Sequence, residues 1–184
     1  MVVGSIPENY SSVDKGYVTS IKNQNPWGTC WAFAACAAME SYALAHGLVD
    51  SADKVDFSEY ALAYLTSTDN LFQDITGDYT STTVANAAFS YGGNDEFAFK
   101  ALSKWAGIYN EDITYYENSA SSGTVTAYVP NEENIEFVFV GQKYIDISQV
   151  DLVKAAIMEH GAVTTSYFDA DRFRADSDGE YYYR

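Results

Sequence analysis

One cysteine, and a glutamine six residues before it, are the side chains of this sequence best suited to covalent chemistry. Cys30 stands where a predicted helix begins, and Gln24 precedes it across a turn. The positive end of a helix and its unpaired N–H groups favour the thiolate, which is the nucleophilic form of a cysteine. The side-chain amide of Gln24 can point at the same oxygen as the backbone N–H of Cys30. Two donors aimed at a developing oxyanion beside a nucleophile indicate acyl transfer.

The helix that must position this thiol is predicted to be buried. From Cys30 to Met39 the sequence holds only Cys, Trp, Ala, Phe and Met. A helix that is apolar on every face lies in a core or in a membrane, and this run is far short of the ~20 apolar residues that span a bilayer. Pro26 and Gly28 interrupt the chain just before it, and Thr29 is predicted to cap it. The alternative is that Cys30 is only a small buried residue, which is the usual role of a free cysteine.

This segment resembles the active-site segment of papain-like cysteine peptidases, the cathepsin family. The matching residues are Val18-Thr19-Ser20-Ile21-Lys22-Asn23-Gln24 and Gly28-Thr29-Cys30-Trp31-Ala32-Phe33. The resemblance implies that Cys30 is the nucleophile, that Gln24 is an oxyanion-hole donor and that Trp31 shields and positions the site. A core aromatic is an equally compatible role for Trp31.

Weaker matches follow in the family's order along nearly the whole chain. Phe57-Ser58-Glu59-Tyr60 resembles the start of a short second helix, Gly92-Gly93 resembles a double-glycine loop, and Gly161-Ala162-Val163-Thr164-Thr165-Ser166 resembles a strand of the second domain. The resemblance implies that Gly92 and Gly93 line a cleft and pair with an extended substrate. It also implies that the strand from Ala162 to Ser166 lines part of a substrate pocket. Without the resemblance, Gly92-Gly93 is a turn that links two helices.

Two features depart from the family pattern. Trp27 stands where most members carry a cysteine that forms a disulfide, so that bridge is not expected here. The family's base is a His followed by an Asn, both beyond the segment at Gly161, and neither occurs before Arg184. His46 and His160 end predicted helices, where a partial positive charge is favourable, and we expect both at the surface. We therefore expect little or no peptidase activity unless a C-terminal segment or a second chain supplies His and Asn.

The predicted fold class is α+β, a papain-like fold of two domains with a buried central helix. Residues 1–115 form a mainly helical domain that carries the nucleophile, and residues 116–184 form a partial, β-rich domain. Helices are predicted over 30–45, 58–65, 84–91, 94–106 and 148–160, with Ser58 and Ser148 as caps. Strands are predicted within 135–147, over 162–168 and over 180–183. Loops or turns are predicted over 66–82, 109–123 and 169–179.

Composition excludes several classes of partner. The 184 residues include 10 Lys and Arg against 26 Asp and Glu, a net charge of -16 that disfavours nucleic acid and anionic membranes. Cys30 and Cys36 point to different faces of one helix, which disfavours a disulfide between them. Neither Cys-x-x-Cys nor a paired His spacing occurs, so we expect no metal site, and no cofactor or transmembrane segment is indicated. The resemblance implies a peptide or protein substrate and a secreted or cell-surface protein, although no signal peptide is found in this sequence.

Three functions stay open from the sequence. The first is a papain-like endopeptidase that acts through a Cys30 thioester. The second is a non-catalytic papain-like domain that binds peptides in its cleft. The third is an unrelated domain of helices and a sheet in which Cys30 is structural. The presence of both Gln24 and Cys30 favours the first.

Overall fold

The computed structural model describes residues 5–67, 89–90, 92–103, 107–126, 128, 135–166, 174–177 and 180–183. The elements in chain order are α1 (Cys30–Ala45), the 3-10 helix η1 (Ala52–Lys54), α2 (Glu59–Ser67), α4 (Asp95–Leu102), β1 (Ile108–Tyr109), α5 (Ile113–Ser122), β2 (Ile135–Phe137), α6 (Val150–His160), β3 (Arg174–Ser177) and β4 (Glu180–Tyr183). Helices dominate, and the strands are short. Among the residues described, no helix has the length and apolar character needed to cross a bilayer.

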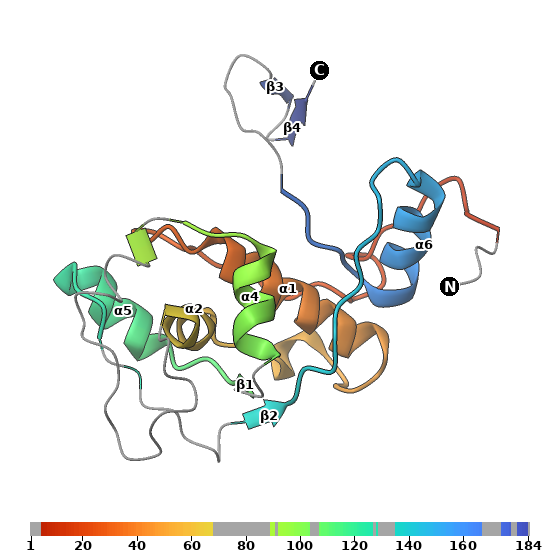
Figure 1. Cartoon of the computed structure of the whole chain (residues 1–184). Coiled ribbons are helices and arrows are strands. Elements are labelled where there is room, and N and C mark those ends of the chain that lie inside the picture. Colours follow the sequence, from red (N-terminus) through yellow and green to blue (C-terminus); the bar gives the residue numbers. More distant parts are fainter. Residues whose placement is uncertain are drawn as a thin grey trace.

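Helix α1 is the central element, as predicted. It contacts α2, α4 and α6 (Figure 1). Its buried side chains include Trp31, Ala32 and Cys36, but one face is not covered. Cys30, Ala34 and Ala37 are exposed. Since residues spaced by four and three positions share one side of a helix, these three form an exposed face at the N-terminal half of α1. The prediction that α1 is buried on every side is therefore wrong for this face.

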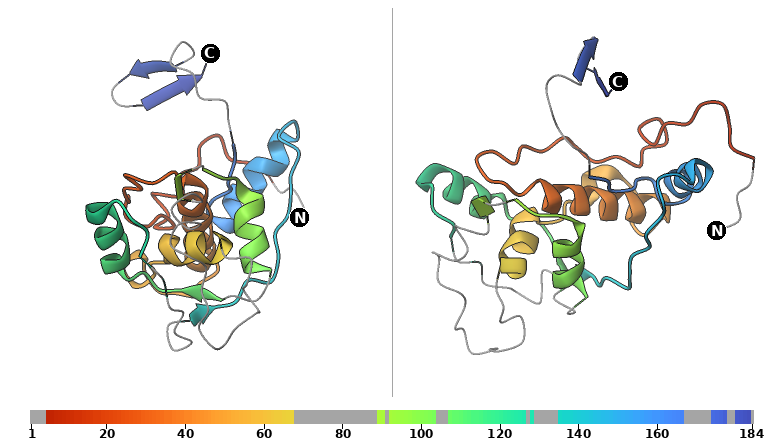
Figure 2. Two further views of the ribbon diagram at one scale, coloured as in Figure 1. Left: turned by 60° about the vertical axis from the view of Figure 1, so that its left-hand side comes forward. Right: turned by 45° about the horizontal axis from the view of Figure 1, so that its top comes forward.

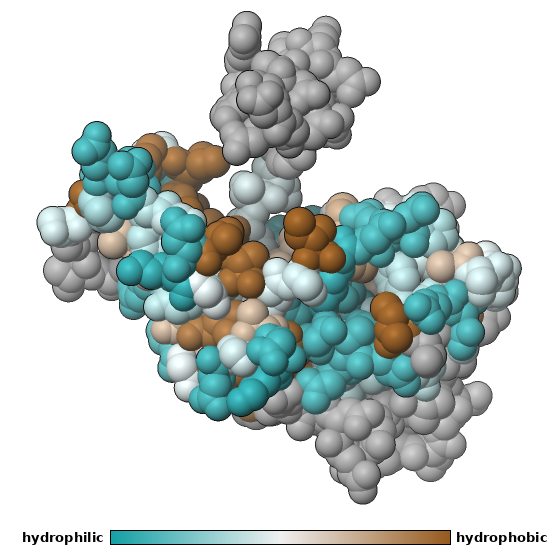
Figure 3. Space-filling model, turned by 180° about the vertical axis from the view of Figure 1, so that it is seen from behind, coloured by the Kyte–Doolittle hydropathy of each residue, from teal (hydrophilic) through white to brown (hydrophobic). Residues whose placement is uncertain are grey.

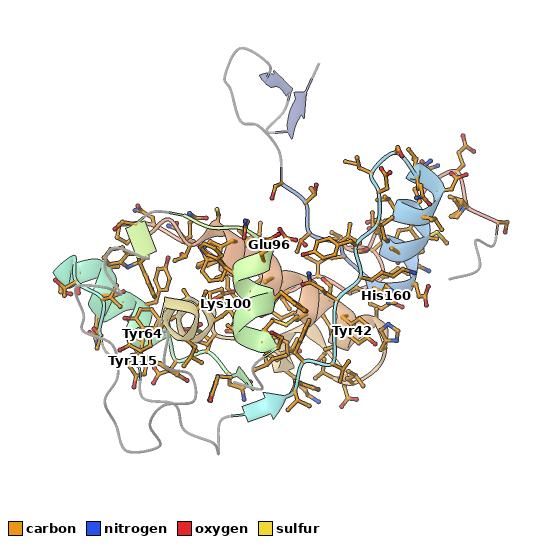
Figure 4. The ribbon with its side chains drawn as sticks, viewed as in Figure 1. Tyr42, Tyr64, Glu96, Lys100, Tyr115 and His160 are labelled. Carbon is orange, nitrogen blue, oxygen red and sulfur yellow. The ribbon has the colours of Figure 1, made fainter. Side chains whose placement is uncertain are left out.

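An aromatic core packs beneath α1. Tyr60 and Tyr64 of α2 are completely buried, and Phe57 and Phe89 are almost so. The Tyr60 hydroxyl satisfies its hydrogen-bonding potential by donating to the Thr126 carbonyl at 2.6 Å. Figure 4 shows Tyr64 and Tyr115 on the same side of the molecule, between α2 and α5. This core ties α5 and the residues that follow it to the N-terminal helices.

Helix α5 occupies a segment that the sequence predicts as a loop over 109–123. Tyr116 and Ser119 of this helix are buried, while Glu117 and Asn118 between them are exposed. This spacing puts one narrow stripe of the helix against the core, although most of its residues are polar. The prediction was wrong because the polar composition masks a stripe of only a few buried residues. The predicted domain boundary at residue 115/116 lies within α5, and the two-domain division stays a prediction.

The helix caps agree with the sequence in part. The Ala61 N–H donates to Ser58 Oγ at 3.0 Å, so Ser58 caps α2 as predicted. Thr29 precedes α1, but its side chain makes no cap hydrogen bond. Ser148 does not cap α6, since Gln149 occupies the N-cap position and the Ser148 N–H donates to Asp146 Oδ1 at 2.9 Å in the preceding turn.

The other helix boundaries shift by a few residues. Helix α4 begins after Asn94, whose side chain accepts the Phe97 N–H at 3.3 Å, and ends at Leu102. It is therefore shorter than the predicted 94–106, of which residues 104–106 lie outside the described part. Helix α2 runs to Ser67, into the predicted loop over 66–82, whose remainder lies outside the described residues. Of the predicted helix over 84–91, only residues 89 and 90 are described, and both are helical.

The strands form two antiparallel pairs in the described chain. β1 pairs with β2, with Ile108 opposite Phe137 and Tyr109 opposite Ile135. β3 pairs with β4 over residues 174–177 and 180–183, which confirms the predicted strand at 180–183. Residues 174–177 were predicted as part of a turn over 169–179, and this prediction is wrong for them. The rest of that turn lies outside the described residues. Residues 138–147 and 162–166 do not form the predicted strands, and residues 167 and 168 are not described. A strand requires a hydrogen-bonded partner, which these segments lack among the described residues.

Helix α6 packs against the C-terminal half of α1. Figure 2 shows α5 near one end of α1 and α6 near the other. A Cβ built at Gly161, which ends α6, would lie 2.8 Å from the backbone oxygen of Ser41. The N-terminal segment covers this contact, because Ser12 Oγ donates to the Gly161 carbonyl at 2.5 Å and Tyr10 Oη to the Met158 carbonyl at 3.5 Å. Backbone contact at Gly161 therefore sets where α6 lies.

Candidate active site

Cys30 is the first residue of α1 and is exposed, as the nucleophile hypothesis requires. No acidic residue lies in the first turn of α1, so no carboxylate there opposes a thiolate at the positive end of the helix. The second thiol, Cys36, is almost completely buried, and burial raises the pKa of that thiol well above its ordinary value. The fold therefore separates one accessible sulfur from one sealed sulfur.

Gln24 lies in a hydrogen-bonded turn with Trp27. Its side-chain nitrogen Nε2 donates to the Trp27 carbonyl at 3.0 Å, and the Trp27 N–H donates to the Gln24 carbonyl at 3.0 Å. This contact fixes the amide with its nitrogen toward Trp27 and uses one of its two N–H bonds. The second N–H is left for another acceptor. Convergence of this N–H with the backbone N–H of Cys30 stays a prediction.

The structure brings the double glycine beside the active-site segment. The Gly28 N–H donates to the Phe89 carbonyl at 2.6 Å, and a Cβ built at Gly28 would lie 3.0 Å from the Gly92 nitrogen. A Cβ built at Gly93 would lie 2.5 Å from Cδ1 of the Trp31 indole. Only glycine permits such close packing. Gly92 and Gly93 therefore lie beside the segment from Gly28 to Trp31, while their lining of a cleft and their pairing with a substrate stay predictions.

Trp31 is buried, with its ring edge-to-face against Phe97 at 5.7 Å between centroids. Its indole Nε1 is buried and has no hydrogen-bond partner among the described residues. The side chain therefore acts at least as a packing residue that supports Gly93 and the start of α4. A direct role for Trp31 in substrate binding stays a prediction.

Ala162 and Ser166 follow α6, whose end contacts α1 at Ser41 and not at Cys30. Ala162 is half-buried, Ser166 is exposed, and both follow Gly161, which contacts Ser41. Ser41 is eleven residues beyond Cys30 on α1, which corresponds to about 16 Å along the helix axis. The contacts of the described residues do not join this segment to Cys30. Its role in a substrate pocket stays a prediction.

Neither histidine is near the thiol. His46 caps the far end of α1, which has 16 residues, so it lies about 24 Å along the helix axis from Cys30. His46 Nε2 and His160 Nδ1 are 3.0 Å apart. The two ring centroids are 5.3 Å apart, and the Tyr42 ring stacks on the His46 ring with their centroids 4.0 Å apart. Figure 4 shows Tyr42 and His160, whose rings also stack, close together. His46 is exposed and His160 is half-buried at this surface cluster. Both rings are used to join the ends of α1 and α6.

A buried charge cluster, which the sequence analysis missed, supports the segment before Gln24. Lys22 Nζ lies 2.8 Å from Glu59 Oε1, 3.2 Å from Glu40 Oε1 and 2.5 Å from Asp56 Oδ1. Burial alone would lower the pKa of Lys22, but Glu59, Asp56 and Glu40 outweigh it and raise that pKa. Glu40 is 1% exposed and accepts the Phe57 N–H at 2.8 Å. The sequence signal for this cluster was Glu40, which directly follows the apolar run of α1. A carboxylate buried on such a helix requires charged or hydrogen-bonding partners.

Two carboxyl groups in this cluster are costly to ionise. Burial raises the pKa of Glu59 to about 7, against the opposing effect of Lys22. Burial also raises the pKa of Glu111, whose two carboxyl oxygens are sealed from solvent. The cluster therefore favours a protonated carboxyl near neutral pH. No group of three or more His, Cys, Asp or Glu side chains suited to a metal ion occurs in the described part of the chain.

Comparison with known proteins gives the family. Residues 6–183 match the model of the papain family cysteine proteases. Shorter stretches match individual relatives. Stem bromelain from Ananas comosus is 41% identical over 61 residues, which cover 33% of this chain and 29% of that protein. Chymomexicain from Jacaratia mexicana is 56% identical over 34 residues, covering 18% of this chain and 16% of that protein. Cathepsin K from Mus musculus is 46% identical over 37 residues, covering 20% of this chain and 11% of that protein.

The match to the family model extends over nearly all of the sequence, although the chain spans less than a third of the length of the curated relatives that it matches. The predicted α+β class agrees with this family, and the short strands of the described residues agree with part of such a fold. With an exposed cysteine opening the central helix and a glutamine fixed in the preceding turn, the sequence match and the geometry lead to one conclusion: the chain belongs to the papain family of cysteine proteases.

Proposed function

We propose that this protein is a cysteine-type endopeptidase in which Cys30 is the nucleophile and Gln24 is an oxyanion-hole donor. The observation that carries the proposal is the exposed sulfur at the first residue of α1, with the Gln24 amide held in the turn before it. A thiolate at a helix N-terminus and two N–H donors facing one oxygen are the parts that acyl transfer needs. The substrate class is a peptide or a protein.

The reaction proceeds in two halves. The Cys30 thiolate adds to the carbonyl carbon of the scissile peptide bond, and the carbonyl π electrons move to the oxygen. The Gln24 amide and the Cys30 backbone N–H stabilise that oxyanion. When the oxyanion collapses, the C–N bond breaks and the amine leaves with a proton. Water then adds to the thioester, the C–S bond breaks, and the carboxylic acid and the Cys30 thiolate are released.

The proton transfers need a base that His46 and His160 do not provide. Both lie at the far end of α1, about 24 Å from Cys30 along the helix axis. We propose that polypeptide outside these 184 residues supplies a His and an Asn to Cys30. Two exposed apolar surfaces support a packing partner: the face of α1 that holds Cys30, Ala34 and Ala37, and the segment 138–150, in which Val140 is 93% exposed. An unpaired apolar surface of this kind commonly marks an interaction site.

The test uses a fluorogenic peptide and the full chain, which here means these 184 residues together with the polypeptide that supplies the His and the Asn. Cys30→Ala should abolish hydrolysis, and Gln24→Ala should lower kcat about 100-fold, the loss typical of removing one oxyanion donor. Cys36→Ala is the matched control, and it should retain normal turnover if it folds, because Cys36 is sealed in the core. Full hydrolysis by Cys30→Ala would contradict the proposal.

A second candidate is a non-catalytic papain-like domain that binds peptides. The observation in its favour is that neither histidine of this sequence can reach Cys30. The two candidates differ in one measurement, because the binding domain would retain a labelled peptide in equilibrium dialysis without cleaving it. A full chain that carries no His on a strand able to pack near Cys30 would favour this candidate.

The resemblance to exported peptidases also leads us to propose that the protein is secreted or displayed at the cell surface. The support for export is membership of the family. Antibody detection of the native protein should find it in the culture medium or accessible to protease on intact cells. Detection only inside the cell would contradict export.

A further inference from the structure

Two side chains of α5 contact the turn that carries Gln24. The Tyr116 hydroxyl donates to the Gln24 backbone carbonyl, and the Trp27 indole Nε1 donates to Ser119 Oγ at 3.1 Å. Each pair is 92 residues apart in sequence, and the partners are three residues apart on both sides. One turn of α5 therefore lies alongside the turn from Gln24 to Trp27 and contacts both of its ends.

Trp27 orients the amide of Gln24. Gln24 Nε2 donates to the Trp27 carbonyl at 3.0 Å. If the amide were flipped, its oxygen would face the carbonyl oxygen, and two acceptors would oppose each other. As long as Trp27 keeps its place, the Gln24 amide presents its remaining N–H rather than its oxygen. Any residue that holds Trp27 therefore also sets the direction of this donor.

Ser119 is suited to hold Trp27. It is completely buried, and its hydroxyl accepts the Trp27 indole N–H while donating to the Tyr116 carbonyl at 2.9 Å. Trp27 and Tyr116 are also buried, at 8% and 7% exposed. The two hydrogen bonds of the Ser119 hydroxyl are buried, and a hydrogen bond in such a low-dielectric environment is stronger than one in water. The Trp27 ring packs edge-to-face on Phe89 at 5.8 Å, which fixes its other side.

We infer that Tyr116 and Ser119 are positioning residues for the oxyanion site. Tyr116 holds the backbone of Gln24, and Ser119 holds its side chain through Trp27. This role needs no contact between either residue and the substrate. Helix α5 therefore keeps the amide donor in place. This inference rests on the proposed role of Gln24.

The experiment compares Tyr116→Phe and Ser119→Ala with two controls in the full chain. Tyr115→Phe and Ser121→Ala remove a hydroxyl from the same helix, and Ser121 is an exposed residue that bonds only within α5 among the described residues. We expect kcat to fall about tenfold in Tyr116→Phe and Ser119→Ala with KM unchanged. The affinity for a peptide aldehyde, whose hemithioacetal oxygen occupies the oxyanion position, should fall by the same factor. The rate of Cys30 alkylation by iodoacetamide, which needs no oxyanion donor, should stay within twofold.

The double variants decide whether the effect passes through Gln24. In a Gln24→Ala background, adding Tyr116→Phe or Ser119→Ala should cause no further loss in kcat, because the donor that they position is already gone. A further tenfold loss in that background, control-like kinetics of the single variants, or an equal loss in alkylation rate would each overturn the inference. If hydrolysis depends on Cys30 and Gln24 while any of these is found, only the positioning role fails. If hydrolysis does not depend on Cys30, the proposed function fails.

Discussion

Two cysteines on one helix have opposite surroundings. Cys30 opens α1 and is exposed, whereas Cys36 is sealed in the core. Reactivity of a thiol follows its access and its thiolate fraction, and burial lowers both for Cys36. The two residues therefore provide an internal comparison between a candidate nucleophile and a structural cysteine in the same molecule.

Alkylation of the native protein tests this difference. Iodoacetamide at neutral pH should modify Cys30 and leave Cys36 unmodified, with at least a hundredfold difference in rate, about 3 kcal/mol in activation free energy. Peptide mapping by mass spectrometry of the full chain measures both sites at once. Denatured protein is the control, in which both residues should react. Equal modification of the two thiols in the native state would contradict the assigned surroundings.

The histidines allow a second prediction at this scale. His46→Ala and His160→Ala, alone or together, should leave kcat/KM within twofold, because both rings lie about 24 Å from Cys30 along the helix axis. Peptide hydrolysis by the full chain is the measurement, with Cys30→Ala as the inactive reference. A loss in the double variant as large as that in Cys30→Ala would identify one of these histidines as the base and refute the need for an outside residue.

At the scale of single residues, the sequence predicted the position of Cys30 but not the residues that contact the turn before it. The place of Cys30 at the start of α1 followed from apolar composition and the breaks before it. Tyr116 and Ser119 could not be identified, because their importance depends on contacts 92 residues away in sequence. Thr29 shows the opposite error, since a favourable residue type stood at the right position but formed no cap.

Among the elements, α2 and the segment before α1 share the buried charge cluster. Lys22 joins Glu40 of α1 to Glu59 of α2. Lys22 is one positive charge among several carboxyl groups. It lowers the pKa of Glu59, but the effect of burial is larger and raises that pKa to about 7. The cluster holds the helices together best when one of its carboxyl groups carries a proton.

Stability should therefore fall as pH rises. The pKa of Glu59 is higher in the folded protein than its ordinary 4.5, so its contribution is complete below about pH 4.5 and is lost as pH rises toward about 7. We expect the free energy of unfolding, measured in urea, to be on the order of 1–3 kcal/mol higher at pH 5 than at pH 8. Glu111→Gln should reduce this dependence, because it removes a neighbouring negative charge that raises the pKa of Glu59. Equal or greater stability at pH 8 would contradict the role of the cluster.

Elements were predictable where their pattern is strong and local. The predictions of α1 from its apolar run and of α2 from its capping serine were correct. Helix α5 was missed because only one narrow stripe of it is buried. Of the strands predicted within 135–147 and over 162–168, residues 135–137 form β2, whereas 138–147 and 162–166 lack strand partners among the described residues. Strand formation depends on a neighbour that the local sequence does not specify.

At the scale of the whole molecule, α1 connects two regions with different roles. Its N-terminal end carries Cys30 and faces α5, and its C-terminal end holds α6 (Figure 2). Seen from behind, the surface carries separate hydrophobic patches among hydrophilic residues (Figure 3). The exposed apolar side chains of segment 138–150 are where we propose that further polypeptide packs. The exposed face of α1 with Cys30, Ala34 and Ala37 is the other surface that we propose for this packing.

Attachment of α6 to α1 depends on Gly161. A side chain there would meet the Ser41 backbone at 2.8 Å and would also adopt a φ of +85°, which is strained for any residue with a Cβ. Gly161→Ala should destabilise the full chain by about 2–3 kcal/mol and speed hydrogen exchange in α6. Gly16→Ala is the control, with a φ of +74° and nothing within 4 Å of its Cβ, and should cost about 1 kcal/mol. Equal effects of the two substitutions would show that close packing at Gly161 is unimportant.

The most direct test of the central claim is to trap the acyl-enzyme. The full chain is mixed with a peptide ester, quenched in acid within milliseconds and digested, and the mass of the peptide that contains Cys30 is measured. We predict an added mass equal to the acyl group on the Cys30 sulfur, at up to one group per active site, and none when Gln24→Ala slows acylation below deacylation. Rapid turnover of the ester with the Cys30 peptide unmodified, or with the acyl group on another residue, would contradict the account.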